Sequence, residues 1–319
     1  MRQIEKNRTY LVTVNAVTKS FRFVPRPIIV ATLWFCFAAI VLKYRKRILM
    51  HEFLFMSNHF HLVLTDADEC LPNFMRDLNS LLSRALNSTR GTRGTNIEKG
   101  YHAEVLLDDE AIIRACVYVL ANASAANLVK RSRQWKSVTS AALSYDAPAS
   151  FDRPTSGLWK GALRHASRDN SVRSGRANYA RRWKVPAIAE LFLVRPPVRS
   201  KLRSKELRSL IWKRLSQRDV AQIKRRRANK TSVLGWTAVI SRAFTDIPPS
   251  GQEMFGEAPI AAAEDKALVA RAVEQRKTFI AKYRAALARF LEGDVDVVFP
   301  YGTWRMARLF KVKCHAAPA

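Results

Sequence analysis

Two histidines lie two residues apart in the segment Met56-Ser57-Asn58-His59-Phe60-His61-Leu62-Val63-Leu64. The segment is rich in apolar and aromatic residues, which predicts a buried strand. Because residues i and i+2 of a strand point to one face, His59 and His61 would project side by side and Phe60 would face a core. Two neutral imidazoles suit a divalent cation. Two unrelated histidines also fall at this short spacing by chance, so the metal interpretation needs a third ligand from elsewhere in the chain.

A tyrosine and an asparagine lie four residues apart further along, at Tyr118 and Asn122, in a stretch with helical periodicity. They therefore share one face of a helix. A tyrosine hydroxyl can act as a covalent nucleophile, but its ordinary pKa of about 10 keeps it protonated, so it needs assistance. A metal ion that stabilises charge on a phosphoryl group would supply that assistance. Two imidazoles and the amide oxygen of Asn122, with waters and phosphate oxygens, suit Mg²⁺ or Mn²⁺. The alternative for Tyr118 is a half-buried helix aromatic without a catalytic role.

The first 140 residues alternate strand and helix patterns. β-branched and aromatic residues predict strands over 9–14, 47–56, 59–65 and 103–107, with Ser57-Asn58 as a tight turn. Apolar residues at helical spacing predict helices over 28–43, from 71 to about 87, and from 108 onward. This order is that of a ferredoxin-like split βαβ unit. We therefore expect an α+β fold in which a central antiparallel hairpin carries both histidines.

The chain carries a large excess of positive charge. Its 319 residues include 55 Lys and Arg against 26 Asp and Glu, a net charge of +29. Such an excess indicates a polyanionic partner, most simply nucleic acid. Residues 151–250 hold 24 Lys and Arg against 6 Asp and Glu, whereas residues 51–150 hold 10 against 11. We therefore expect a catalytic domain over 1–140 and a basic, mainly helical DNA-binding extension over 141–319.

The basic extension has its own helical patterns, over 201–227, 232–240 and 264–291, after a connector over 140–180. A strand over 297–300 and a turn close the chain. The first helix ends in Lys224-Arg225-Arg226-Arg227, for which we favour contact with DNA phosphates over a solvated helix end. Three tryptophans among the basic residues could stack on unpaired bases, although tryptophans are more often core residues: Trp183, Trp212 and Trp236.

Several other segments have non-catalytic interpretations. The fifteen uncharged residues 28–42 are too few for a membrane span and predict a buried helix. The four cysteines form no Cys-x-x-Cys pair, which argues against a zinc ribbon and favours a reducing cytosolic setting. The other polar residues near the motif are weaker candidates, expected to be structural or solvated: His51, His102, Asp66, Asp68 and, as a nucleophile, Tyr101.

These motifs resemble those of the HUH single-tyrosine transposases, and within them most closely the REP-associated tyrosine transposase branch. The resemblance rests on residues 58–64, on Tyr118-Val119-Leu120-Ala121-Asn122, and on residues 127–131 with Trp135. It covers roughly residues 9–140. Residues 299–303 also resemble the end of the longer members of the branch.

The resemblance implies a function as well as a fold. His59 and His61 would be metal ligands, Asn122 would complete the metal site, and Tyr118 would attack a DNA phosphate and stay joined to the 5′ phosphate, freeing a 3′-OH. The implied protein is a transposase that cleaves and transfers single-stranded DNA beside a hairpin. It would be a monomer or homodimer in the bacterial cytoplasm, at the nucleoid and not in a membrane. The alternative is a nucleic-acid-binding protein that keeps the fold without cleaving.

The sequence departs from the pattern of this branch at three places. Asn122 is followed by Ala123-Ser124 where the branch has Pro-Val, Asn127 stands in place of a Gly, and Ser57 in place of a Pro. The Pro and Gly shape the bend that leaves the catalytic helix. Their loss would either shift Tyr118, which favours the non-cleaving alternative, or merely lengthen the helix.

Overall fold

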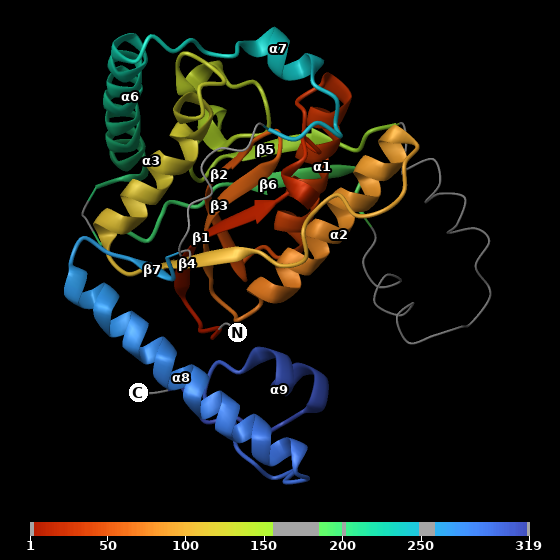
Figure 1. Ribbon diagram of the computed structural model, residues 1–319, viewed down its shortest axis with the longest axis vertical. Coiled ribbons are helices and arrows are strands. Elements are labelled where there is room, and N and C mark those ends of the chain that lie inside the picture. Colours follow the sequence, from red (N-terminus) through yellow and green to blue (C-terminus); the bar gives the residue numbers. More distant parts are fainter. Residues whose placement is uncertain (1–2, 156–184, 200–201, 249–258, 318–319) are drawn as a thin grey trace.

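The computed structural model describes residues 3–155, 185–199, 202–248 and 259–317 (Figure 1). Its centre is a five-stranded sheet with the strand order β2-β3-β1-β4-β7. The first four strands pair antiparallel, and the short β7 extends the edge parallel to β4. The strands are β1 (Arg8–Asn15), β2 (Ile48–Phe55), β3 (His59–Asp66), β4 (His102–Leu106) and β7 (Ala261–Ala262). The α+β class expected from the sequence is confirmed.

One face of the sheet is covered by α1 (Pro27–Lys43) and α2 (Leu71–Arg90). Proline fits the first helical position, where its missing N–H costs no hydrogen bond, so α1 begins at Pro27. Ten of its 17 residues are buried, so the apolar stretch over 28–42 is a core helix as predicted. Within the described ranges, no helix combines the length and the apolar character that a membrane crossing requires.

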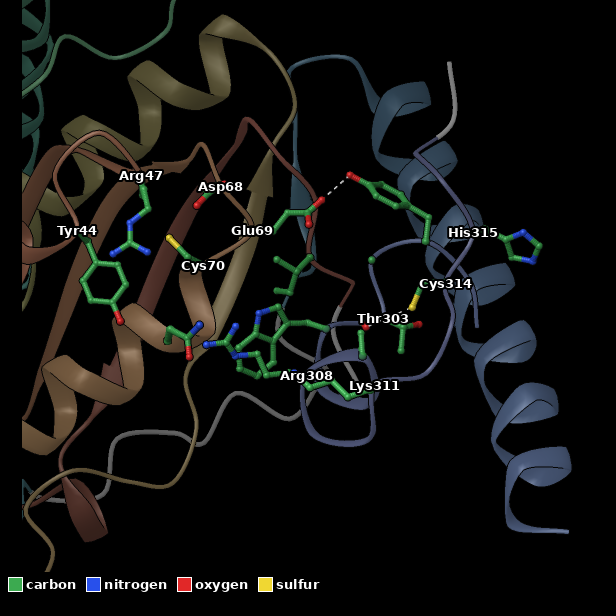
Figure 2. A pocket seen from close by; sticks show the side chains of 16 residues that line it. Tyr44, Arg47, Asp68, Glu69, Cys70, Thr303, Arg308, Lys311, Cys314 and His315 are labelled. Atoms are coloured by element: carbon green, nitrogen blue, oxygen red, sulfur yellow. Dashed lines mark hydrogen bonds between the residues drawn. The ribbon is translucent and has the colours of Figure 1, made fainter. Parts of the chain in front are cut away.

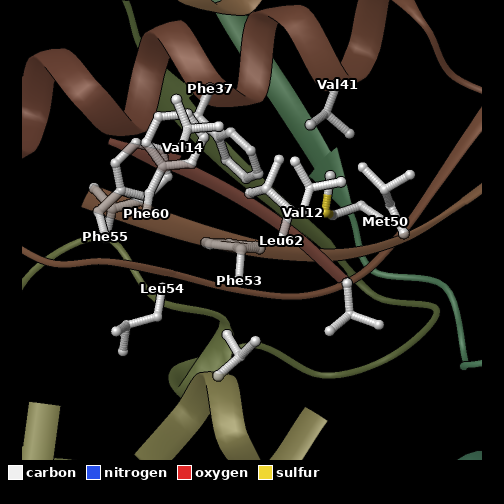
Figure 3. Packing of buried hydrophobic residues seen from close by; sticks show 14 of the residues in the cluster. Val12, Val14, Phe37, Val41, Met50, Phe53, Leu54, Phe55, Phe60 and Leu62 are labelled. Carbon is white, nitrogen blue, oxygen red and sulfur yellow. The ribbon is translucent and has the colours of Figure 1, made fainter. Parts of the chain in front are cut away.

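The core between α1 and the sheet is largely aromatic. Figure 3 shows Phe37 of α1 facing Phe53, Phe55 and Phe60 of the sheet, whereas Leu54 points to the opposite face. The rings of Phe55 and Phe60 stack with their centroids 4.6 Å apart. Phe60 therefore faces the core as predicted, which turns its neighbours along β3 to the other face.

That other face is covered by α3 (Asp109–Ala125), and α6 (Ser204–Ala228) packs on the outside of α3 (Figure 1). Asp108 begins α3 by accepting a hydrogen bond from the backbone N–H of Ala111, at 2.7 Å. The buried stripe of α6 consists of Leu207, Ile211 and Leu215, spaced four apart. Helix α3 is thus held between the sheet and α6.

A buried ion pair fixes α6 to the sheet. The Glu52 side chain on β2 is fully buried, and its carboxylate pairs with the guanidinium of Arg208 on α6. The hydroxyls of Ser140 and Tyr145 each donate to this carboxylate at 2.5 Å. Arg208 also donates to the carbonyls of Ser140 and Leu143, at 2.6 and 3.0 Å. Because a buried charge is tolerated only when it is fully paired, this network specifies where α6 docks.

The main core does not end near residue 140. It includes buried residues on β6 (Ile188–Phe192), on α6 and on α7 (Trp236–Ser241). A second, smaller core lies between α8 (Lys266–Leu291) and α9 (Trp304–Phe310), and its buried residues are Phe279, Tyr283, Ala286, Val297, Phe299, Met306 and Val312. The expected domain boundary at residue 140 is therefore not marked by a change of core, and it stays a prediction.

Three details of the second half differ from the sequence expectations. The strand expected over 297–300 is wrong: only an isolated bridge joins Phe299 to Cys314, and a helix starts at Trp304. A two-stranded sheet of β5 (Pro148–Asp152) and β6 stands in the region expected to be mainly helical. The helix expected over 232–240 begins only at Trp236, because Gly235 has a positive φ of 84°. Strand β5 begins with a proline and ends with an aspartate, two residues that are depleted in strands, so its sequence carries no strand signal.

Replacing Arg208 with Ala should destabilise the fold strongly, because it leaves the fully buried charge of Glu52 without its partner. We expect the free energy of unfolding to fall by about 3–5 kcal/mol in a chemical denaturation experiment. Lys213→Ala, on the exposed side of the same helix, is the matched control and should change it by less than about 0.5 kcal/mol. Equal effects of the two substitutions would contradict the role given to the ion pair.

Candidate active site

The two histidines of the motif lie side by side on β3, on the face that α3 covers. Their ring centroids are 4.8 Å apart, and the rings are nearly perpendicular at 79°. The pairing of β1 with β3 places Asn15 opposite His59 and Thr13 opposite His61. The strand geometry expected for the motif is therefore present.

Hydrogen bonds orient both imidazoles in the same way. The Nδ1 atom of His59 lies 2.8 Å from the side-chain oxygen of Asn58, which can only accept, so Nδ1 carries the proton. The Nε2 atom of His61 lies 3.1 Å from the Asn122 amide nitrogen, which can only donate, so Nε2 holds a lone pair. The Nδ1 proton of His61 then faces the Thr13 hydroxyl at 2.9 Å. Such a partner fixes the tautomer of a metal-binding histidine.

The other two predicted residues reach the histidines from α3. The Asn122 amide is hydrogen-bonded to His61. The ring of Tyr118 also lies against His61, with the ring centroids 5.3 Å apart and an angle of 71° between the ring planes. The structure thus brings together His59, His61, Tyr118 and Asn122 from two elements that are far apart in the sequence. Their chemical roles stay predictions.

Burial keeps both imidazoles neutral. Burial lowers the pKa of His59 to about 4, against the opposing effect of a hydrogen bond with Asn122. Burial and the neighbouring charge of His59 lower the pKa of His61 to about 3. The lone pairs on both Nε2 atoms are therefore present at neutral pH. Among the described residues no three His, Cys, Asp or Glu side chains gather, and the polar side chain that joins the histidines from α3 is Asn122.

The end of α3 accommodates the departures noted in the sequence. The helix continues through Ala123 and ends at Ala125, and Asn127 then takes a left-handed conformation with a φ of 56°. Asparagine adopts this conformation more readily than other residues with a side chain, so it can stand where a glycine would. The backbone N–H of Leu128 closes the turn on the carbonyl of Ala123, at 3.0 Å.

Helix α6 braces the same turn with a buried acid and a buried base. The Asp219 carboxylate accepts from the hydroxyls of Ser124 and Ser132, both at 2.7 Å, and from the Ser132 backbone N–H. The Arg226 guanidinium donates to the carbonyls of Ser124 and Lys130, at 2.9 and 2.6 Å. These contacts hold the end of α3 without the proline and glycine.

The basic cluster at the end of α6 therefore divides into two sets. Arg226 is buried and occupied within the protein, so its side chain is not free to bind DNA. Lys224, Arg225 and Arg227 are exposed. For these three, contact with DNA stays a prediction.

The weaker candidates serve the fold where the structure describes their contacts. His51 is buried, and both ring nitrogens are hydrogen-bonded, one to the Val194 carbonyl and one to the Thr65 hydroxyl. Asp66 is not in a solvated turn: it is buried and accepts three backbone N–H groups at the start of α2. Asp68 is exposed.

The aromatic candidates that the structure describes are partly buried against neighbouring side chains. Tyr101 packs against the main core. Trp236 lies edge-on to the buried Trp135, with centroids 5.7 Å apart, and Trp212 lies under the guanidinium groups of Arg133 and Arg208. Trp183 lies outside the described residues.

A separate pocket of about 520 Å³ lies at the opposite end of the sheet, beside α9 (Figure 2). Strand β3 runs from His59 to Asp66, and the pocket begins just beyond, at Asp68 and Glu69. The hydroxyl of Tyr301 donates to Glu69 at 2.7 Å across it. This pocket contributes no side chain to the four-residue site.

Sequence reasoning missed two residues that orient the site, Thr13 and Asp219. Thr13 belongs to a strand that was predicted, but its pairing with His61 depends on the register between β1 and β3. Asp219 lies 95 positions from Ser124, its hydrogen-bond partner. Asp219 is one of two acidic residues in the otherwise basic helix α6, the other being Glu206, and this contrast in charge was the signal that the sequence offered.

Comparisons with known proteins give little further information. No protein-family model matches the chain, and no curated protein matches it. Three solved chains match. One is a REP-associated tyrosine transposase bound to a REP hairpin, at 16% identity and a TM-score of 0.36, over 44% of this chain and 80% of that chain. Because this likeness is too weak to establish a shared fold, the case for a function rests on the geometry of this chain.

Replacing Asn127 tests how the end of α3 is held. Asn127→Ala should lower the free energy of unfolding by about 1 kcal/mol, because alanine is strained at a positive φ. Asn127→Gly also loses the asparagine side chain, but glycine adopts a positive φ without strain. Its free energy of unfolding should therefore exceed that of Asn127→Ala by at least about 1 kcal/mol. Thermal and chemical unfolding of both variants would check this. Equal stabilities would contradict a left-handed residue at this position.

Proposed function

We propose that this protein is a metal-dependent single-strand DNA endonuclease and strand transferase, of the HUH tyrosine transposase type. The observation that carries the proposal is the meeting of Tyr118 and Asn122, from one face of α3, with the Nε2 lone pairs of His59 and His61. A nucleophile beside a ligand set for a divalent cation is what phosphoryl transfer to a tyrosine needs.

The strand order supports the same proposal. Strands β2-β3-β1-β4 pair antiparallel in that order, with α1 and α2 as the connections, which is the order of a ferredoxin-like split unit. We propose this arrangement for the catalytic domain. It places the hairpin β2–β3, and with it both histidines, next to β1 in the sheet.

The proposed reaction transfers a phosphoryl group to Tyr118. The phenol oxygen loses its proton and forms a bond to the phosphorus of a DNA phosphodiester, and the bond from that phosphorus to the 3′ oxygen breaks. The 3′ oxygen takes up a proton and leaves as a 3′-OH, and the 5′ side of the DNA stays joined to the tyrosine. Attack by a 3′-OH on this linkage would complete strand transfer.

His59, His61 and Asn122 would hold the metal ion, Mg²⁺ or Mn²⁺. The donor set fits, since both imidazoles are neutral with Nε2 available, and a turn of the amide would present its oxygen in place of its nitrogen. When bound, the ion would neutralise charge on the phosphoryl oxygens. Thr13 and Asn58 would keep the two rings in the ligating tautomer.

The partner in this proposal is single-stranded DNA next to a hairpin. The net charge of +29 and the exposed side chains of Lys224, Arg225 and Arg227 support a polyanion partner. We propose a cytoplasmic, nucleoid-associated protein that acts as a monomer or homodimer.

A covalent-adduct gel tests the proposal. The wild-type protein, mixed with labelled single-stranded hairpin oligonucleotides from the DNA flanking the gene, should form an adduct that survives denaturation. The adduct should require Mg²⁺ or Mn²⁺ and disappear on addition of a chelator. Tyr118→Phe should abolish it, because phenylalanine lacks the attacking oxygen, and His61→Ala should reduce it at least about 100-fold.

Two controls make this gel decisive. Tyr101→Phe removes another tyrosine hydroxyl near the sheet and should leave the adduct unchanged. Gel-shift binding by Tyr118→Phe should also be unchanged. An adduct that forms equally well in Tyr118→Phe would contradict the proposal, whereas DNA binding with no adduct in any protein would favour the non-cleaving alternative.

The exposed part of the basic cluster can be tested through the salt dependence of binding. Replacing Lys224, Arg225 and Arg227 together with Ala should reduce the slope of log K against log salt by about 2, at about 0.7 per phosphate contact on a single strand. Fluorescence anisotropy with a labelled hairpin oligonucleotide measures this slope. A triple replacement of Lys266, Lys282 and Arg284, exposed on α8, removes the same charge and should change the slope less. Equal changes of the slope in the two triple variants would mean that binding depends on the net charge of the protein and not on these three side chains.

A further inference from the structure

A pocket of about 550 Å³ opens beside Tyr118, on the same sheet face as the histidines. Thr13 of β1 pairs with His61 on one side and with His102 of β4 on the other, so these three side chains form a row across the sheet. The next row toward the pocket contains Leu11 and Glu104. The pocket therefore continues the candidate active site by one or two strands.

The interior and the rim of this pocket differ in chemistry. The side chains that line its interior are apolar and mostly buried, and they are Leu11 and Leu106 of the sheet and Ala111, Ala115 and Val117 of α3. Arginines from two helices stand at its rim, Arg114 on α3 and Arg214 and Arg218 on α6. An apolar hollow with cationic groups at its edge suits a nucleotide, whose base is flat and whose phosphate is anionic.

Two of the arginines are placed for a phosphate next to the nucleophile. The Arg218 guanidinium carbon lies 5.7 Å from the centroid of the Tyr118 ring. Arg114 is one helical turn before Tyr118, on the same face of α3. Within the described residues, ion pairing occupies Arg214, which binds Glu110 at 2.6 Å, but neither Arg114 nor Arg218. Their charges are thus available to a ligand.

Glu104 is the acidic group of the pocket, and the fold leaves it uncommitted as well. Its carboxyl makes no hydrogen bond or ion pair with another described residue, and burial raises its pKa. By contrast, the Nε2 atom of His102 donates to the Pro259 carbonyl at 2.7 Å, and the Thr13 hydroxyl is hydrogen-bonded to His61. A carboxylate can accept a hydrogen bond from the amino group of a base.

We propose that this pocket is a nucleotide subsite for the strand that Tyr118 attacks, with Arg218 and Arg114 on a backbone phosphate and Glu104 selecting a base that carries an amino group. Cytosine, adenine and guanine carry such a group, and thymine does not. The inference rests on the proposed function, because it assigns a place to the DNA next to the cleaved bond. It predicts sequence preference immediately beside that bond.

The pocket separates its charges in a way that fits this assignment. The arginines come from α3 and α6, which form its wall, whereas Glu104 comes from β4 in the sheet. Among the residues that line the pocket, Glu104 is the only acidic one. A phosphate would meet the cationic wall, and the base would lie in the apolar interior with its polar edge at Glu104.

The test measures adduct formation with each base beside the cleaved phosphate. Using the full-length protein with its metal ion and a hairpin oligonucleotide that it cleaves, each nucleotide flanking the cleaved bond is replaced in turn by the other three bases. For the wild type we expect adduct formation at least about tenfold slower with thymine at one flanking position. Glu104→Gln should reduce this preference to about threefold or less, because an amide both donates and accepts.

Arg218 variants test the phosphate contact separately. Arg218→Ala should slow adduct formation by about 10- to 100-fold at an unchanged base preference, and Arg218→Lys should recover part of the rate by retaining the charge. Lys213→Ala, on the same helix but pointing to solvent, is the control and should retain the wild-type rate. Unfolding temperatures measured in parallel identify any variant that fails to fold.

The outcomes separate the two proposals. A wild-type adduct with no base preference at any flanking position, or a preference that Glu104→Gln leaves intact, would overturn the subsite while the proposed function stands. A wild-type protein that binds the oligonucleotides but forms no adduct on Tyr118 would overturn the proposed function, and the subsite with it.

Discussion

The docking of α3 between the sheet and α6 is the constraint on which the candidate site depends. Helix α3 has buried residues around most of its circumference, so its apolar pattern alone does not select one rotation, and a shift of one residue turns each side chain by about 100°. Two buried charged networks prevent such a turn here. Glu52 and Arg208 fix one end of α6, and Asp219 with Arg226 fixes the other end to the turn after α3. Tyr118 and Asn122 consequently face the histidines.

These networks also change how the charge of the chain is interpreted. Arg208 and Arg226 count toward the net charge of +29, but both bind groups inside the protein. Arg208 pairs with the Glu52 carboxylate and donates to backbone carbonyls, and Arg226 donates to backbone carbonyls. A charge count cannot separate such residues from exposed ones, because it contains no information on burial. The exposed Lys224, Arg225 and Arg227, and the half-exposed Arg218 beside Tyr118, are among the described positions where a polyanion can make contact.

The first half of the fold could be predicted from sequence because its signals are local. The apolar run around His59 and His61, the proline at the start of α1 and the acids at the start of α3 are signals that each lie within a few residues. Local signals also placed Tyr118 and Asn122 on one helix face. The contact between that helix and β3 could be expected only from the order of strands and helices along the chain. Features set by distant partners could not be predicted, such as the register that brings Thr13 to His61 and the burial of Arg226. The helix α9, with seven residues, has a pattern too short to recognise, and β5 contains a proline and an aspartate, which are depleted in strands.

In the proposed reaction, the oxygen of Tyr118 forms the covalent bond with DNA. Tandem mass spectrometry of a protease digest, after reaction of the wild-type protein with a cleavable hairpin oligonucleotide and nuclease trimming, locates that bond directly. We expect a nucleotide 5′ phosphate attached to the peptide that contains Tyr118, at the tyrosine itself. A nucleotide attached to a different residue would contradict it.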